Sequence, residues 1–131
     1  MSEDRSTAED RSDQEGTVSD CIFCRIVAGD LPAEEVASSP LTLAFRDVSP
    51  VMPSHVLVVP RRHIDSAATL ERGDAEVLSE LFQTARRVAD SEGLADRGWR
   101  LVLNVGDDAR NSVAHLHMHV LGGRPMDWPP G

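Results

Sequence analysis

A chain of 131 residues, of which 40% are hydrophobic, has the size of one ordinary domain and can bury a core. Its net charge of −9 argues against a nucleic-acid polymer as the main ligand, because cations that face phosphates dominate such binding. No apolar run approaches the roughly 20 residues of a membrane span, and the N-terminus lacks the basic-then-apolar order of a signal peptide. We therefore expect a cytoplasmic protein without a membrane partner.

The first 19 residues differ in composition from the rest of the chain. They are polar and charged and carry almost no large apolar side chains, so they cannot bury enough surface to offset the entropy cost of ordering. We expect residues 1–19 to form a disordered acidic tail and residues 20–131 to form the folded domain. A regulatory or partner-binding role for the tail stays open.

Apolar side chains that recur with helical or strand period predict two helices and five strands. The helices are a short one over residues 21–28 and a long one that begins after Asp74, and Gly29 and Gly93 follow them as expected stop signals. The predicted strands, in chain order, are residues 34–38, 41–46, 55–59, 99–105 and 113–121. These elements fit an α+β domain with a five-stranded antiparallel sheet.

The last predicted strand alternates histidine with apolar residues. Because strand side chains point to opposite faces with period 2, we expect His115, His117 and His119 on one face, about 6.5–7 Å apart. Either a zinc ion could use all three imidazoles, or one imidazole could act as a nucleophile while the others position the substrate. The opposite face would cover the core with Ala114, Leu116, Met118 and Val120.

This His-x-His-x-His run, followed by two apolar residues, resembles the signature of the histidine triad (HIT) nucleotide hydrolases and transferases. The Cys-Ile-Phe-Cys segment at residues 21–24, the turn at residues 45–50 and the C-terminal extension, residues 122–131, look like the Hint branch of that family. The resemblance covers residues 21–131. It implies that the sheet continues across a homodimer.

The resemblance also implies catalytic roles. His117 would attack the α-phosphate, His119 would donate a hydrogen bond to a phosphate oxygen, and His55 would hold the array from behind. A neutral imidazole is nucleophilic near pH 7, and clustered imidazoles disfavour protonation of one another. Ser112 would contact the phosphate or help to protonate the leaving amine, unless it only closes the loop into the strand. No catalytic metal is required.

A purine nucleotide such as AMP or an AMP conjugate is the ligand that the resemblance implies. Asp47 would accept hydrogen bonds from the ribose hydroxyls, unless it is only a turn residue, and Asn104 would reach the ribose or phosphate. The base would lie between apolar walls formed by Ile22, Phe23, Val48 and Leu57.

The predicted phosphate loop departs from the family pattern. Residues 109–112 read Ala-Arg-Asn-Ser where Gly-Gly-Gln-Ser is more usual. The loss of both glycines restricts positive φ angles, and Arg110 adds a cation near the phosphate entrance. Asn111 has a shorter side chain than glutamine, so its expected contact with phosphate is in question.

Cys21 and Cys24 are separated by two residues, which is weak evidence by itself. The pair could be redox-active, reactive, or simply buried and reduced. The zinc-carrying members of the HIT family match His63 and His115 as the other two ligands of a tetrahedral structural site. If His115 binds zinc, it is not a free member of the catalytic row.

Three functions remain in view. The first is hydrolysis of the P–N bond of nucleoside 5′-phosphoramidates of the AMP-amine or AMP-lysine type, through a nucleotidyl-histidine intermediate. The second is hydrolysis of dinucleoside polyphosphates. The third is a nucleotide-binding scaffold protein whose hydrolysis is incidental. The C-terminal Trp-Pro-Pro-Gly favours the first, because by resemblance it packs near the partner's site and shapes leaving-group preference.

Overall fold

The computed structural model describes residues 20–131, so the predicted acidic tail lies outside the described residues. Five strands form one antiparallel sheet in the order β1-β2-β3-β5-β4, which confirms the predicted fold class. The strands are β1 (Glu35–Ser38), β2 (Thr42–Arg46), β3 (Ser54–Pro60), β4 (Trp99–Leu103) and β5 (Met118–Gly122). The helices are α2 (Ile22–Val27) and α3 (Ala75–Ser91), with the 3₁₀ turns η1 (Ala67–Thr69) and η2 (Arg72–Asp74) between β3 and α3.

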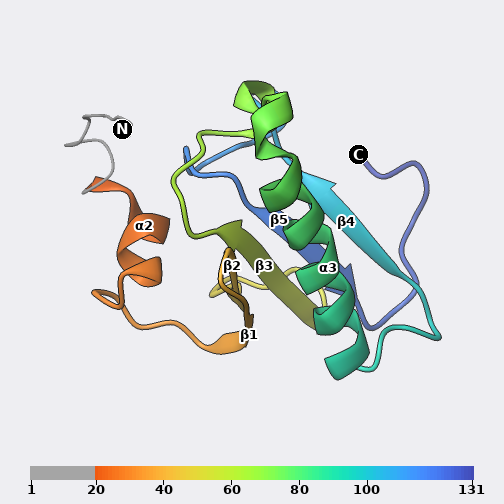
Figure 1. Cartoon of the computed structure of the whole chain (residues 1–131). Helices are drawn as coiled ribbons and strands as arrows, with labels where there is room; N and C mark the ends of the chain where they lie inside the picture. Colours follow the sequence, from red (N-terminus) through yellow and green to blue (C-terminus); the bar gives the residue numbers. More distant parts are fainter. Residues whose placement is uncertain (1–19) are drawn as a thin grey trace.

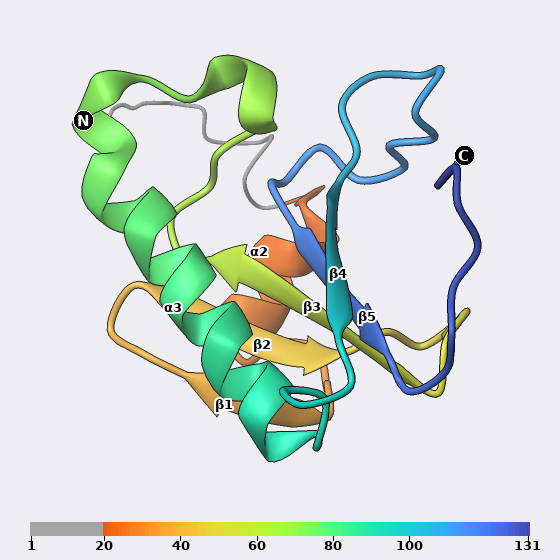
Figure 2. The same ribbon diagram turned by 90° about the vertical axis from the view of Figure 1, so that its right-hand side faces the viewer.

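Helix α3 lies across one face of the sheet, and α2 lies on the other side (Figures 1 and 2). The strand period explains this arrangement. Val56 and Val58 of β3 and Met118 of β5 pack with Leu81 and Val88 of α3 in the larger core cluster. On the opposite face, the smaller core cluster contains Phe23, Leu43, Phe45, Leu57 and Val59. Strand β3 is apolar on both faces because both are covered.

The short helix α2 ends as the sequence predicts. Gly29 follows it with a φ angle of 84°, a left-handed conformation that glycine adopts without steric cost. The side chain of Cys21 precedes the helix and accepts a hydrogen bond from the Cys24 amide at 3.3 Å. Both cysteines are therefore held at the beginning of α2, facing the end of β3.

The helix α3 begins directly after Asp74, as predicted, but without a side-chain cap. Asp74 precedes the helix, but its side chain caps no amide of α3. Its carboxylate instead accepts a hydrogen bond from the Glu71 amide at 2.9 Å and pairs with Arg62. Asp74 thus stabilises the η2 turn rather than the first turn of the helix.

The prediction of one strand over residues 113–121 is wrong in its first half. Strand β5 begins at Met118, and residues 113–117 form an irregular segment. On one side the ladder stops there because β4 ends at Leu103, the partner of Met118, rather than at residue 105. On the other side, Val59 and Pro60 of β3 pair with β2 but not with residues 116 and 117. Ala114 is exposed instead of covering the core.

The C-terminal extension, residues 123–131, contains no helix or strand. It runs on the side of β4 and β5 (Figure 2). The Arg100 guanidinium donates a hydrogen bond to the Asp127 carbonyl at 3.1 Å and lies 5.9 Å from the Trp128 ring centre. The Trp128 side chain is 80% exposed. No helix among residues 20–131 has the length and hydropathy needed to cross a bilayer.

Candidate functional site

A cavity of about 630 Å³ opens on the face of the sheet that carries α2. Its walls come from α2, the loop after β2, and the ends of β3, β4 and β5. The predicted site residues that line it are Ile22, Phe23, Asp47, Val48, His55, Leu57, Asn104, Ser112, His117 and His119. Asn111 does not line this cavity, and its Oδ1 atom is buried without a hydrogen-bond partner among the described residues.

Sequence reasoning missed part of the apolar wall. Val102 of β4 and Leu121 of β5 also line the cavity. Strand alternation could have found Leu121, because it lies two residues after His119 and therefore on the same face. Val102 pairs directly with His119 across the two strands, which requires knowledge of the register.

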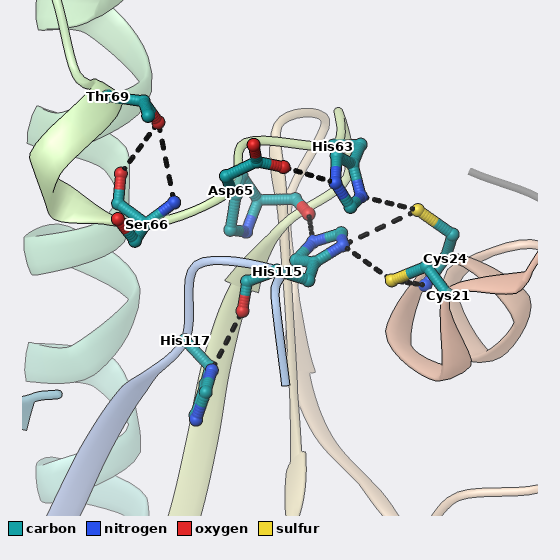
Figure 3. A network of polar contacts seen from close by, with 9 residues as sticks. Cys21, Cys24, His63, Asp65, Ser66, Thr69, His115 and His117 are labelled. Atoms are coloured by element: carbon teal, nitrogen blue, oxygen red, sulfur yellow. Dashed lines mark hydrogen bonds and ion pairs between the residues drawn. The ribbon is translucent and has the colours of Figure 1, made fainter. Parts of the chain in front are cut away.

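His117 and His119 lie side by side, with ring centres 5.2 Å apart. His117 lies just before β5, and its Nδ1 is 2.8 Å from the His115 carbonyl oxygen. A carbonyl oxygen only accepts hydrogen bonds, so Nδ1 carries the proton and donates it. In the neutral ring, Nε2 of His117 therefore has a free lone pair, and it points away from the His115 carbonyl (Figure 3).

His55 lies behind His119, and its two ring nitrogens have separate partners. Its Nδ1 accepts a hydrogen bond from the Val51 amide at 3.1 Å, so its own proton is on Nε2. This Nε2 donates to His119 Nδ1 at 2.8 Å. His119 consequently carries its single proton on Nε2, as a hydrogen-bond donor.

The same logic argues against a metal at the group formed by Asp47, His55 and His119, whose ligand atoms lie within 4.8 Å of one another. A metal on His55 Nε2 would displace the proton to Nδ1, where it would face the Val51 N–H. The Val51 N–H and the His55 Nδ1–H would then face each other, and neither would have an acceptor. The group is better suited to hydrogen bonding.

Burial keeps these rings uncharged. Desolvation, followed by the neighbouring charges of His117 and His55, lowers the pKa of His119 to about 4, so its ring is neutral at pH 7. Burial also lowers the pKa of His55, and the Asp47 carboxylate opposes that shift. The five histidines offer two ring nitrogens each. Among the described residues, only Nε2 of His117 and Nε2 of His119 have no hydrogen-bond partner.

Arg46 is the one arginine that lines the cavity. Its guanidinium forms two hydrogen bonds with Glu92, at 2.7 and 2.8 Å, and one with Glu34 at 3.0 Å. These carboxylates already neutralise its charge. The groups available to an anionic ligand in the cavity are therefore uncharged donors rather than a free cation.

The loop before His115 is held by its own hydrogen bonds. Asn104 donates from Nδ2 to the Ala109 carbonyl at 2.8 Å, so this amide fixes the loop as well as lining the cavity. Arg110 has a φ angle of 63°, in the left-handed region where the more usual residue would be glycine. Its side chain is exposed and does not line the cavity.

A second cluster contains Cys21, Cys24, His63 and His115, whose four ligand atoms lie within 4.8 Å of one another (Figure 3). His115 Nδ1 lies 3.3 Å from Cys21 Sγ and 3.4 Å from Cys24 Sγ, and His63 Nδ1 lies 3.2 Å from Cys24 Sγ. His115 therefore faces the sulfurs and does not line the cavity. Its ring still lies on the α2 side of the sheet, as the prediction of a shared face requires, because Phe23 packs against both His115 and His117, with ring centres 6.0 and 5.2 Å apart.

The outer nitrogens of both cluster histidines are engaged. His115 Nε2 donates to the Pro60 carbonyl at 2.9 Å, and His63 Nε2 lies 2.9 Å from the Asp65 carboxylate. Both Nδ1 atoms are thus left as lone pairs that face the sulfurs. This is the arrangement in which an outer carboxylate or carbonyl orients a metal-binding histidine.

A hydrogen bond from Cys24 lowers the pKa of Cys21 to about 2, and the same hydrogen bond raises the pKa of Cys24. Two sulfurs and two imidazole nitrogens match the donor set of tetrahedral structural zinc. In such a site sulfur and nitrogen ligands lie about 3.5 Å apart, close to the separations found here. The residues therefore fit the ion.

The chain is similar in sequence and in fold to known proteins of one family. The chain is 41% identical to an uncharacterized HIT-like protein of Synechocystis over 86% of this chain and 97% of that protein. It is 39% identical to a 14 kDa zinc-binding protein of Zea mays over the full length of both. The crystal structure of a HIT family hydrolase from Legionella pneumophila is 42% identical and superposes with a TM-score of 0.83, covering 86% of this chain and 100% of that one. The sequence model of the HIT domain family matches residues 28–126, so the chain belongs to the HIT family.

Proposed function

We propose that the protein hydrolyses the P–N bond of nucleoside 5′-phosphoramidates of the AMP-amine or AMP-lysine type. The observation that carries this proposal is the state of two neighbouring rings in the cavity. His117 offers an unprotonated Nε2, and His119 offers an Nε2–H donor. A nucleophile beside a neutral donor suits attack on a phosphorus atom whose oxygens carry negative charge. The similarity to proteins named HIT family hydrolases supports a hydrolase.

The reaction has two displacements. Nε2 of His117 attacks the α-phosphorus, the P–N bond breaks, and its electron pair leaves with the amine, which takes a proton from solvent that the Ser112 hydroxyl relays. His119 donates a hydrogen bond to a phosphoryl oxygen. Water then attacks the phosphorus and releases a proton to solvent, and the P–Nε2 bond breaks with its electron pair returning to Nε2, which releases the nucleoside monophosphate and restores His117. One difficult step is thereby divided into two easier ones.

The nucleotide would lie with its base between α2 and the loop after β2. Ile22, Phe23, Val48 and Leu57 supply apolar walls, and Asp47 accepts hydrogen bonds from the ribose hydroxyls. Because Arg46 is already paired with two carboxylates, phosphate recognition depends on His119, Ser112 and backbone amides. Asn111 lies outside the cavity lining and is not given a ligand contact.

We further propose a structural zinc ion held by Cys21, Cys24, His63 and His115. The support is the donor set, the two oriented lone pairs and the similarity to a protein named as zinc-binding. The ion would connect the start of α2 to the segment before β5. It would leave His117, His119 and His55 for the reaction.

A homodimer is also part of the proposal. The sheet ends at β4, whose outer edge has no strand partner among the described residues. Pairing of two such edges would continue the sheet and bring the C-terminal extension of one copy near the other copy.

The proposed activity is tested with His117→Ala. We expect kcat on adenosine 5′-phosphoramidate to fall by several orders of magnitude while the Kd for AMP changes less than about threefold, because a nucleophile acts mainly in the transition state. Mass spectrometry of the rapidly quenched wild-type protein should find the nucleotidyl group on the peptide that contains residue 117.

Equal turnover by the variant, or a nucleotidyl group on another side chain, would exclude this mechanism. Faster wild-type turnover of diadenosine tetraphosphate than of the phosphoramidate would favour the second candidate function. Binding of AMP without turnover of either substrate would favour the scaffold. An unchanged melting temperature shows that the substitution has not unfolded the protein.

A further inference from the structure

The Asp47 side chain and backbone amide also have partners within the protein, besides the proposed ribose contact. One carboxylate oxygen, Oδ1, accepts a hydrogen bond from the Ser49 amide at 2.8 Å. The other, Oδ2, lies 3.3 Å from His55 Nε2. In addition, the Asp47 amide donates to the His55 carbonyl at 3.0 Å. The loop after β2 is thus fastened to His55 by both its backbone and its side chain.

His55 is the only described residue that hydrogen-bonds the His119 ring, and it also lies against the Asp47 carboxylate. Its side chain is 4% exposed, and that of Asp47 is 19% exposed, so the contact is shielded from water. The His55 Nε2–H donates to His119 Nδ1, and the Asp47 carboxylate lies 3.3 Å from the same nitrogen, where its negative charge favours the protonated Nε2. On the other side of the His55 ring, the Val51 amide donates a hydrogen bond to Nδ1.

We propose that Asp47 is a positioning residue for His119, acting through His55 to fix the proton that His119 presents to the substrate. The inference rests on the proposed function and adds to the ribose contact expected of Asp47. The carboxylate keeps the His55 proton on Nε2, and His55 in turn keeps the His119 proton on the nitrogen that faces the cavity. An aspartate that orients an imidazole in this way favours the productive tautomer and supports any positive charge that develops.

The groups that face His119 are few. They are His117 from the preceding segment, His55 from β3 and Asp47 from the loop after β2. Arg46, the nearest arginine in the cavity wall, is neutralised by Glu34 and Glu92. Among residues 20–131, Asp47 is therefore the only negative charge that raises the pKa of His55 and of His119, and its removal should change both.

Asp47→Asn is the substitution that tests this. An amide keeps the size of the side chain, and its oxygen can still accept the hydrogen bond from the Ser49 N–H, but it removes the negative charge beside His55 Nε2. We expect kcat on adenosine 5′-phosphoramidate to fall about tenfold or more. Loss of the negative charge disfavours protonation of the rings, so the acid limb of kcat/KM should move to lower pH by about 0.5–1 unit.

A second substrate separates this role from the ribose contact. The 2′,3′-dideoxyadenosine 5′-phosphoramidate has no hydroxyl groups for Asp47 to bind. If Asp47 acts through His55, Asp47→Asn lowers kcat by the same factor, within about threefold, on both substrates. If Asp47 acts only on the ribose, the variant and the wild type turn over the dideoxy substrate equally and share one acid limb, and the proposal is overturned. Asp90→Asn, an exposed change of equal charge on α3, is the matched control.

A measurement on the wild-type protein covers the case in which the variant does not fold. Two-bond ¹H–¹⁵N correlation spectra report histidine tautomers directly. We expect protons on Nε2 of both His55 and His119, and a proton on Nδ1 of either ring would overturn the proposal. This result does not depend on turnover, so failure of the relay and failure of the phosphoramidase activity can be distinguished.

Discussion

At the scale of single residues, the site is defined by which nitrogen of each ring is occupied. His115 shows this best, because it serves two sites at once. Its ring faces the cysteines, while its backbone carbonyl accepts a hydrogen bond from His117 Nδ1–H. The order of histidines along the chain identifies the residues but not these partners. The Pro60 carbonyl and the Asp65 carboxylate, which orient the cluster histidines, come from residues that carry no motif.

Arg110 gives a prediction at this scale. Holding a non-glycine residue in the left-handed region costs about 1–3 kcal/mol of folding free energy. Glycine adopts this conformation without that cost, but it makes the unfolded chain more flexible, which offsets part of the gain. We expect Arg110→Gly to raise the free energy of unfolding by about 0.5–1 kcal/mol in denaturant titrations. Asp108→Gly, in the same loop and without a positive φ angle, should lower it. A less stable Arg110→Gly variant would mean that the arginine side chain has an unrecognised stabilising contact.

At the scale of elements, the sequence predicted all five strands and both helices, because each has a clear apolar period or a glycine stop signal. It failed at residues 113–117, where histidine alternates with apolar residues from Ala114 onward but β4 has already ended. The Leu116 amide there bonds instead to the Ile64 carbonyl, beyond the end of β3. Periodicity shows which faces a segment could have, and only the ends of its neighbours decide where the ladder stops.

The proposed zinc ion gives a prediction about α2. A helix of six residues is too short to be stable alone, and Phe23 is its only buried residue. If zinc connects it to the segment before β5, a chelator should lower the Tm by roughly 10 °C, since loss of a tight ligand costs about 2–3 kcal/mol. Cys21→Ser with Cys24→Ser should reproduce that loss, abolish zinc in elemental analysis and make the chelator ineffective, with a smaller effect on kcat. An unchanged Tm in a zinc-free protein would refute the connection.

At the scale of the whole molecule, the fold uses the two faces of the sheet for different purposes. The face under α3 is a continuous apolar core, and the opposite face holds both the cavity and the cysteine and histidine cluster. The cavity residues come from segments up to about a hundred positions apart, such as Ile22 and His119. Local patterns could not bring these together, so only the resemblance to the HIT family predicted them as one site.

The edges of the sheet give the last prediction. In an antiparallel strand, alternate amides point to opposite neighbours, so a strand at a free edge leaves every second N–H exposed to water. If β4 pairs with its copy in a homodimer, all of its amides should be protected from hydrogen exchange, and light scattering should give twice the chain mass of 14.3 kDa. Strand β1, at the other edge, is the internal control, because its outward amides should exchange rapidly in either case. A dimer in which the outward amides of β4 exchange as fast as those of β1 would associate through another surface. A monomer would leave the cavity to be completed within a single chain.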